Sequence, residues 1–409
     1  ARSSIEPRQM SEYVPPYWGS NEFEQVNGYP RYPAREMARR FAFADGLLAD
    51  QDLDALVVGG ATAPLETSVQ YFSNWPSQVQ SYVVLSPASE PTMFVRLWNH
   101  LPDAERISVI ADVRYGGDTP PEQAETVARF IDRRGATNIG LIGVVPHGDM
   151  SVFRSVLPDA DFRDMNRHYQ DFRLVKSDDE MAFVRIASRM NDAAVAALAD
   201  ELRPGINETD IARIVEDTYL GHRGWNLIHF SLSTPMDNPE VFVPHQYHPD
   251  RTLAAGDVFV TEISTTFWGY AGQILRTFTI GSGPTPRYER LHAVALDAYE
   301  SITGALRPGC TVGQVLDAAD AITDAGFDIW DDLVHGFGGA YLPPIVRTRA
   351  SRGATHPDDF AYPDGTLLVV QPNVIDGNAG VQIGNSMRLT ESGVEVTQEY
   401  PTELIVCEG

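Results

Sequence analysis

The sequence contains almost no lysine and is short of positive charge as a whole. Lys176 is the single lysine among 31 basic residues, and 56 acidic residues bring the net charge to −25. Such an excess of negative charge opposes binding to nucleic acids and to anionic membranes, so neither is expected as a partner. No apolar run approaches the roughly 18 residues of a transmembrane helix, so no membrane span is expected.

Cysteine is also scarce, and no pattern of a targeting segment is visible. The two cysteines, Cys310 and Cys407, fit a reducing compartment better than a disulfide-stabilised scaffold. The first 20 residues are polar and rich in proline, unlike a signal peptide. These features predict a cytoplasmic protein.

A chain of 409 residues predicts two domains. Residues 1–33 are expected to form an irregular N-terminal arm. From 34 to 172, alternating patterns predict an α/β domain. Its expected helices and strands lie at 34–50, 54–59, 81–85, 92–95, 107–110, 122–134, 138–144 and 151–157.

A second domain is expected from 173 to 409. Ser177 and Glu180 form a capping-box pattern that predicts a long helix from there to about residue 202. The phrase Leu-Arg-Pro-Gly occurs at 202–205 and again 104 residues later, at 306–309. Leu-Ile-His ending at His229 is matched by Leu-Val-His ending at His335, 106 residues on. Two echoes nearly in step predict two related halves that face each other across a curved sheet.

The stretch from 256 to 281, GDVFVTEISTTFWGYAGQILRTFTIG, predicts two strands joined by a tight turn, with Glu262 and Gln273 on facing positions. Its Gly-Asp, Gly-Tyr and Arg-Thr-Phe phrases resemble the creatinase, aminopeptidase P and prolidase family, the "pita-bread" or peptidase M24-like proteins. The resemblance is specific over 173–409 and general over 34–170. It implies an α/β N-terminal domain followed by an α+β pita-bread domain with a pseudo-twofold internal repeat.

Metal-dependent members of this family hold two metal ions with two Asp, one His and two Glu. At the matching positions this chain has Glu262, Gln273, His335, Gln371 and Gly384. Hard divalent ions need oxygen ligands, and bridging carboxylates hold a metal pair. Neutral residues at three of the four carboxylate positions therefore predict no dinuclear metal site and no other cofactor. A single metal on Glu262 and His335 is a weaker alternative.

The resemblance to creatinases, which also lack the metals, implies two catalytic residues. His245 lies 11 residues before Gly256, the spacing of the creatinase proton carrier, and histidine titrates near neutrality. The alternative for His245 is a histidine of a surface loop, and His248 lies close enough to be mistaken for it. Glu262 is expected to anchor the substrate or to act as base or nucleophile, unless it forms a structural pair with Arg276 or another arginine.

The remaining expected site residues bind a small-molecule substrate. Gln273 and Gln371 can each donate and accept hydrogen bonds, either to a polar ligand or to each other. Tyr341, in a Tyr-Leu-Pro-Pro turn like that of ectoine hydrolases, offers a hydroxyl. The resemblance also implies a homodimer whose N-terminal domain lies near the partner's site. The expected substrate-binding set is Gln273, His335, Tyr341, Gln371, His229, Arg347 and Trp75.

These residues together predict a metal-independent creatinase-like hydrolase that cleaves a C–N bond in a small polar or cyclic nitrogen compound. One alternative is a metal-free lyase that abstracts a proton in the same pocket. Another is a non-catalytic relative that only binds a ligand or partner. Retention of both His245 and Glu262 favours an enzyme.

Overall fold

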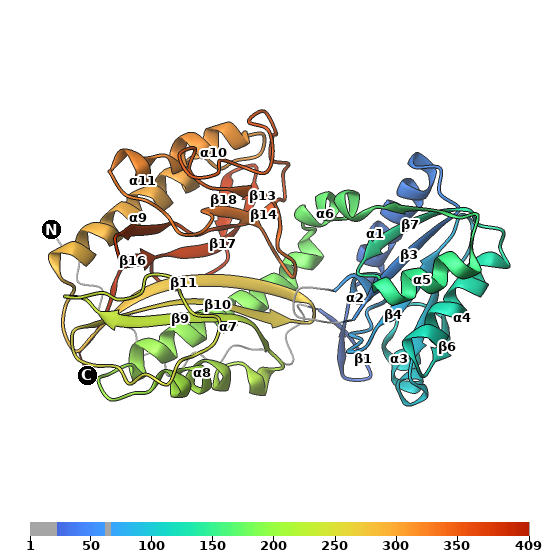
Figure 1. The fold of residues 1–409 in the computed structure, drawn as a ribbon, viewed down its shortest axis with the longest axis horizontal. Helices are drawn as coiled ribbons and strands as arrows, with labels where there is room; N and C mark the ends of the chain where they lie inside the picture. The colour runs from blue at the N-terminus through green and yellow to red at the C-terminus, as the bar shows by residue number, and fades with distance from the viewer. Residues whose placement is uncertain (1–22, 62–66, 409) are drawn as a thin grey trace.

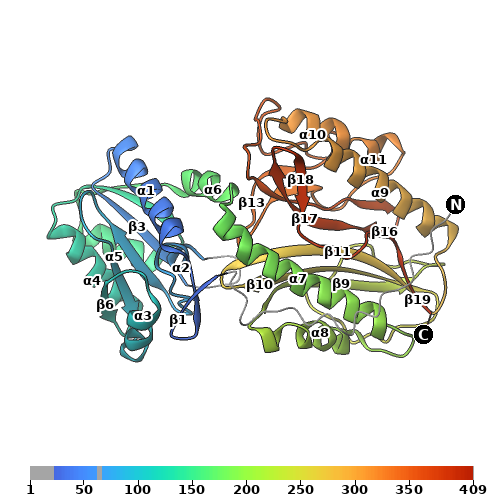
Figure 2. The same ribbon diagram turned by 180° about the vertical axis from the view of Figure 1, so that it is seen from behind.

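The computed structural model describes residues 23–61 and 67–408. It has two lobes, each built around one large sheet (Figure 1, Figure 2). Most of the expected N-terminal arm, residues 1–22, lies outside the described residues. The part that is described includes a hairpin of β1 (Glu24–Val26) and β2 (Tyr29–Arg31).

The N-terminal lobe contains a six-stranded mixed sheet in the order β6-β5-β4-β3-β7-β8. The strands are β3 (Ala55–Gly60), β4 (Ser81–Leu85), β5 (Thr92–Arg96), β6 (Asp112–Gly117), β7 (Asn138–Gly143) and β8 (Asp161–Asp164). The helices are α1 (Ala34–Asp50), α2 (Ser68–Ser73), α3 (Leu101–Ile107), α4 (Pro120–Asp132), α5 (His147–Val156) and α6 (Asn166–Leu174).

One strand expected in this lobe, at 107–110, is absent. Ile107 ends α3, and the strand β6 begins only at Asp112. Ile107 and Ile110 are both buried in the same core cluster, which explains the apolar pattern. A short apolar run alone does not distinguish a strand from the buried end of a helix.

The C-terminal lobe contains a nine-stranded sheet with the central order β13-β12-β14-β17-β11-β10-β9. Its strands are β9 (Trp225–Pro235), β10 (Asp257–Phe267), β11 (Tyr270–Ile280), β12 (Val334–Gly336), β13 (Leu342–Val346), β14 (Leu367–Val370), β17 (Gly384–Thr390), β18 (Gly393–Val396) and β19 (Ile405–Cys407). A separate hairpin joins β15 (Asn373–Asp376) to β16 (Ala379–Gln382). The helices are α7 (Asp178–Glu201), α8 (Glu208–Asp217), α9 (Pro286–Ala305), α10 (Val312–Ala319) and α11 (Ala321–Asp324).

The order of elements repeats within this lobe. A long helix, a short helix and three strands occur as α7, α8, β9, β10 and β11, and again as α9, α10, β12, β14 and β17. The two sets of strands meet at the β11–β17 pair. Leu202 caps α7 with φ −65° and ψ 124°, and Leu306 caps α9 with φ −73° and ψ 124°. The Leu-Arg-Pro-Gly echo therefore marks equivalent turns, and the expected fold class is confirmed.

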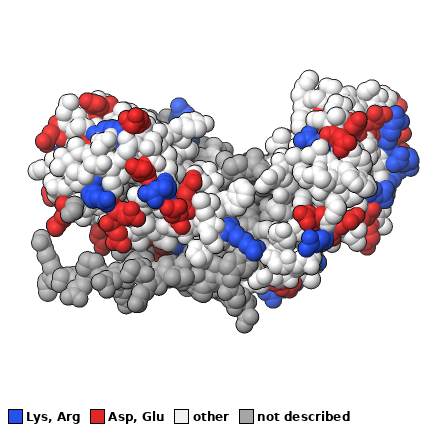
Figure 3. Space-filling model, turned by 90° about the horizontal axis from the view of Figure 1, so that it is seen from below, with Lys and Arg blue, Asp and Glu red and all other residues white. Residues whose placement is uncertain are grey.

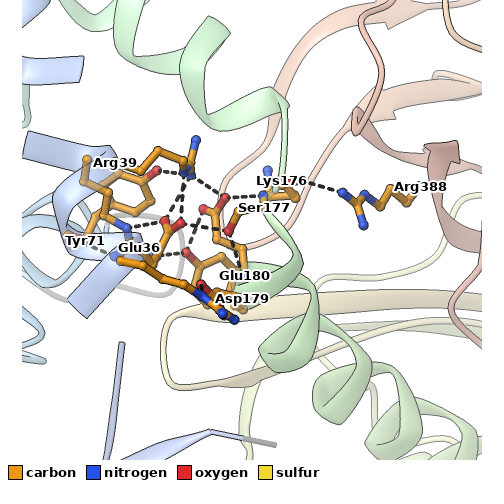
Figure 4. A network of polar contacts seen from close by, with 11 residues as sticks. Glu36, Arg39, Tyr71, Lys176, Ser177, Asp179, Glu180 and Arg388 are labelled. Carbon is orange, nitrogen blue, oxygen red and sulfur yellow. Dashed lines mark hydrogen bonds and ion pairs between the residues drawn. The ribbon is translucent and has the colours of Figure 1, made fainter. Parts of the chain in front are cut away.

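The two lobes are joined by buried polar contacts between α1 and the start of α7 (Figure 4). The Nη2 of Arg39 lies 2.6 Å from Oε2 of Glu180, and the Ser177 hydroxyl donates to Oε2 of Glu36 at 2.8 Å. The hydroxyl of Tyr270, on β11, donates to Oε1 of Glu180 at 2.8 Å. Glu180, the predicted capping-box residue, thus also links the N-terminal lobe to the central sheet.

Charges of both signs are mixed on the face drawn in Figure 3, with a notch between the lobes. Within residues 23–61 and 67–408, no helix combines the length and apolarity that a membrane crossing requires.

Candidate functional site

The candidate site lies on the face of the C-terminal sheet opposite α7. Glu262 of β10 pairs with Leu275 of β11, and its neighbour Ile263 pairs with Ile274. Ile263 and Ile274 pack in the core formed with α7, and successive side chains on a strand alternate in direction. Glu262 therefore points to the other face. Arg276 points toward α7, so the alternative Glu262–Arg276 pair is wrong.

A chain of hydrogen bonds runs through this face. Nε2 of Gln273 donates to Oε1 of Glu262 and to Oε1 of Gln371, both at 2.8 Å. Nε2 of Gln371 donates to Oδ1 of Asp332 at 3.2 Å, and the Tyr341 hydroxyl donates to Oδ2 of Asp332 at 2.5 Å. Glu262 and Gln273 are diagonal rather than directly opposite, because Gln273 pairs with Ser264. The two glutamines thus connect two buried carboxyl groups.

Glu262 holds its proton at neutral pH. The pKa of its carboxyl is raised from 4.5 to about 8, chiefly by burial and also by the nearby charges of Asp331 and Asp332. A buried ionised carboxylate without a cation is costly, whereas the protonated form is neutral. The pKa of Asp332 is also raised by burial, an effect that the neighbouring His335 opposes.

Two buried polar atoms beside Glu262 have no hydrogen-bond partner among the described residues. They are Oε1 of Gln273 and the hydroxyl of Ser264. Gln273 is only 1% exposed, and both N–H groups of its amide are used by Glu262 and Gln371. A buried acceptor that lacks a donor is uncommon in folded proteins and indicates a place for a ligand or water. The free oxygen fits a ligand that carries N–H groups.

His335, Tyr341 and Arg347 lie at the Asp332 end of this chain. Nδ1 of His335 is 3.0 Å from the Gly336 carbonyl oxygen, and its ring centre is 4.6 Å from that of Tyr341. Arg347 is close enough to lower the pKa of Asp332. Five of the seven expected binding residues therefore come together with Glu262. The acidic pair Asp331 and Asp332 was missed, although it directly precedes the Leu-Val-His phrase.

The structure does not bring His229 to this site. His229 pairs with Ile263 across β9 and β10, so it points to the face that carries α7. Its ring lies 4.5 Å from that of His248, and burial lowers its pKa to about 3. His229 therefore lies apart from Glu262, and its expected contact with a substrate stays a prediction. The second sequence echo joins two histidines that lie on different faces of the sheet.

His245 is also separated from Glu262. Its backbone forms a bridge with Ser231 of β9, and bridged residues point to the same face. Ser231 is two residues from His229 and shares its face, whereas Glu262 pairs with Phe230. His245 lies instead near Glu208 of α8, whose pKa is raised by burial, an effect that Ser233, Arg251 and His245 partly oppose. Its expected catalytic role stays a prediction that these contacts do not support.

Trp75 lies in the core of the N-terminal lobe and is 8% exposed. It packs there with α2 residues such as Phe72 rather than with the sheet that carries Glu262. Its expected contact with the substrate stays a prediction.

The titration of Glu262 makes the stability of the protein depend on pH. The folded protein binds a proton at Glu262 up to pH about 8, whereas the unfolded chain releases it near 4.5. The unfolding free energy should therefore fall between these values, by on the order of 1 kcal/mol per pH unit. Denaturant titrations of wild type and Glu262→Gln at pH 5 and 8 test this. The difference in unfolding free energy between the two proteins should shift in favour of the variant from pH 5 to pH 8. A difference that does not change with pH would contradict the assigned protonation of Glu262.

Comparison with known proteins identifies the family. The model of metallopeptidase family M24 matches residues 182–391, slightly more than half of the chain. The chain therefore belongs to metallopeptidase family M24, a family of hydrolases. Family members of this kind have the pita-bread fold that the C-terminal lobe displays.

Individual relatives agree with this assignment at low identity. An uncharacterised hydrolase/peptidase of Sinorhizobium fredii is 24% identical over 93% of this chain and 99% of its own. An Xaa-Pro dipeptidase of Pyrococcus furiosus is 23% identical over 65% of this chain and 75% of its own. The crystal structure of the prolidase from Pyrococcus horikoshii superposes with a TM-score of 0.76 at 19% identity, over 90% of this chain and all of its own.

Proposed function

We propose that this protein is a metal-independent hydrolase that cleaves a C–N bond in a small polar nitrogen compound, with Glu262 as the proton carrier. The observation that supports the proposal is a buried, protonated carboxyl beside the unpartnered Oε1 of Gln273. The carboxyl of Glu262 can donate a proton, and Oε1 of Gln273 can accept a hydrogen bond from a ligand N–H.

The residues at the family's metal positions do not fit a pair of divalent ions. The amide nitrogen of Gln273 is directed at Glu262 and at Gln371, and it offers donors where a cation needs acceptors. Within the part of the chain that the structure describes, no three His, Cys, Asp or Glu side chains are grouped to hold a metal ion. Gly384 contributes no ligand at all. A water activated by a metal pair is therefore not part of the proposed mechanism.

In the proposed reaction, the substrate N–H groups bind to Oε1 of Gln273 and to the Ser264 hydroxyl. Glu262 donates its proton to the leaving nitrogen as the C–N bond breaks. A water supplies the hydroxyl that bonds to carbon, and its remaining proton returns to Glu262. A pKa of about 8 suits both halves of this cycle near neutral pH. Asp332 and Tyr341 hold Gln371, which in turn orients Gln273.

This mechanism gives Glu262 the role that was expected of His245. The separation of His245 from Glu262 by the sheet supports the change. The homodimer and the cytoplasmic location remain parts of the proposal that rest on the sequence.

Turnover should be independent of added metal. The protein, purified without chelator, would be assayed for metal content and for hydrolysis of creatine, ectoine-like compounds and Xaa-Pro dipeptides. We expect no stoichiometric metal, and we expect that activity on a small C–N substrate survives EDTA. Loss of activity in EDTA with recovery on adding a divalent ion would overturn the proposal. Binding of these compounds without any turnover would favour the non-catalytic alternative.

A further inference from the structure

A cavity lies between the two lobes, next to the site, and shares only Tyr341 with the hydrogen-bonded residues described there. It has a volume of about 160 Å³. The N-terminal side of the cavity comes from α2 and α6, and the other side from the start of β13 and the residues before it. Its lining residues are Ser68, Asn166, Tyr169, Gln170, Arg173, Ala340, Tyr341 and Leu342. A cavity of roughly 150 Å³ is large enough for a molecule of the size of benzene.

Arg173 gives this cavity a buried positive charge. The residue is 2% exposed, and its Nε is buried without a hydrogen-bond partner in the described part of the chain. No carboxylate among residues 23–61 and 67–408 forms an ion pair with it. Its guanidinium lies instead over the rings of Tyr71 and Tyr169, at 5.0 and 5.5 Å from their centres. Arginine stays protonated in proteins, so this charge is present at all relevant pH values.

The buried carboxylates of the neighbouring network, drawn beside Arg39 in Figure 4, form no ion pair with Arg173, although the charge of Glu180 acts on it. These two carboxylates are Glu36 and Glu180. Glu36 pairs with Arg39 at 2.9 Å and with Arg40 at 2.6 Å, and Glu180 pairs with Arg39 at 2.6 Å. Two carboxylates therefore face three guanidinium groups when Arg173 is counted. Buried charges are normally paired, so the excess cation beside an open cavity calls for an anion.

We infer that the cavity between the lobes binds a small carboxylate, with the guanidinium of Arg173 as its counter-charge. A guanidinium presents parallel N–H donors that match the two oxygens of a carboxylate. The amide side chains of Asn166 and Gln170 line the same cavity and add polar groups around the anion. The size of the cavity favours a group no larger than a short acid.

Tyr341 connects this carboxylate site to the proposed catalytic site. Its ring lines the cavity, while its hydroxyl binds Asp332 in the chain that leads to Glu262. The carboxylate can therefore come from two sources, the acidic end of a substrate or a separate small acid. The first source rests on the proposed function, whereas the presence of the anion site does not.

Acetate is the probe for the site itself. Calorimetry on the full chain would compare sodium acetate with sodium chloride at equal ionic strength. Wild type should bind acetate, and Arg173→Met should bind it at least tenfold more weakly. Arg185→Met is the matched control, because Arg185 pairs with Glu395 at 2.7 Å on the surface, and it should bind acetate like wild type. Failure of wild type to bind acetate, or equal binding by Arg173→Met, would overturn the inference.

A second variant keeps the test open if Arg173→Met does not fold. Gln170→Glu places a carboxylate inside the cavity and should weaken acetate binding at least tenfold by competing for Arg173. Unchanged acetate affinity in Gln170→Glu would contradict the site. The source is then decided with a substrate that turns over, compared as free acid and amide. If Arg173→Met raises the KM of the free acid but not that of the amide, the cavity binds the carboxylate of the substrate. If neither KM changes, the cavity binds a separate small acid. Absence of turnover would count against the proposed function and leave the acetate result standing.

Discussion

Glu262→Gln should lower kcat by about 10²–10⁴-fold, because the amide cannot donate and recover a proton. Glutamine has the size of glutamate, and the wild-type carboxyl is neutral at pH 7. The hydrogen bond from Gln273 can be kept by the new amide oxygen. The variant should therefore fold normally and still bind substrate. Steady-state kinetics with a denaturation curve on the same sample would separate lost chemistry from lost structure.

Two variants on the opposite face of the sheet serve as controls for this result. Glu208 is also a buried carboxyl with a raised pKa, but it accepts a hydrogen bond from Ser233 near α8. Glu208→Gln should keep turnover within a few fold of wild type. His245→Ala is expected to do the same. If His245→Ala abolishes turnover while Glu262→Gln does not, the sequence-based assignment is right and the proposed mechanism is wrong.

Among the substitutions proposed, Glu180→Gln should cause the largest loss of stability, about 3–5 kcal/mol in the free energy of unfolding. Glu180 is 1% exposed and accepts hydrogen bonds from Arg39, Tyr270 and the backbone N–H of Ser177. Without the charge of Glu180, the guanidinium groups of Arg39 and Arg40 share a single carboxylate, that of Glu36. Both the contact between the two lobes and the first turn of α7 should become less stable.

Asp178→Asn is the matched control for Glu180. Asp178 lies two residues away and pairs with Arg388, but its side chain is 86% exposed. Solvent screens such a pair, so the substitution should cost less than about 1 kcal/mol. Chemical denaturation followed by tryptophan fluorescence would measure both variants. Equal effects of the two substitutions would show that burial of the Glu180 pair is not what stabilises the lobe contact.

The proposed mechanism needs a site whose charge is balanced without metal ions. Gln273 and Gln371 carry no charge, and the pKa of Glu262 near 8 keeps its carboxyl protonated. In metal-using relatives, clustered carboxylates at these positions need cations. In the proposed metal-free site, neutral amides and a bound proton on Glu262 reduce the repulsion from Asp331 and Asp332. The same substitutions leave the free oxygen of Gln273 as an acceptor for a ligand.

The sequence by itself determined the family, the fold class and most of the residues that gather around Glu262. The sequence at 256–281 was enough to predict two strands and a turn, since turn glycines and strand-forming residues determine the conformation of the backbone next to them. The capping box at Ser177 and Glu180 and the repeated Leu-Arg-Pro-Gly turns were predictable for the same reason. Helix ends depend on a few adjacent residues.

Only the tertiary structure decided which charged groups meet. Whether His245 or Asp332 lies near Glu262 depends on the register of β9 against β10 and on the fold-back of the segment before β12, both of which involve residues far apart in the chain. A shift of one residue along a strand reverses the face of a side chain, so spacing in the sequence did not reveal that His229 and His245 point away. The pKa of Glu262 and the unpaired charge of Arg173 likewise follow from burial, which arises only when the sheet and the two lobes are assembled.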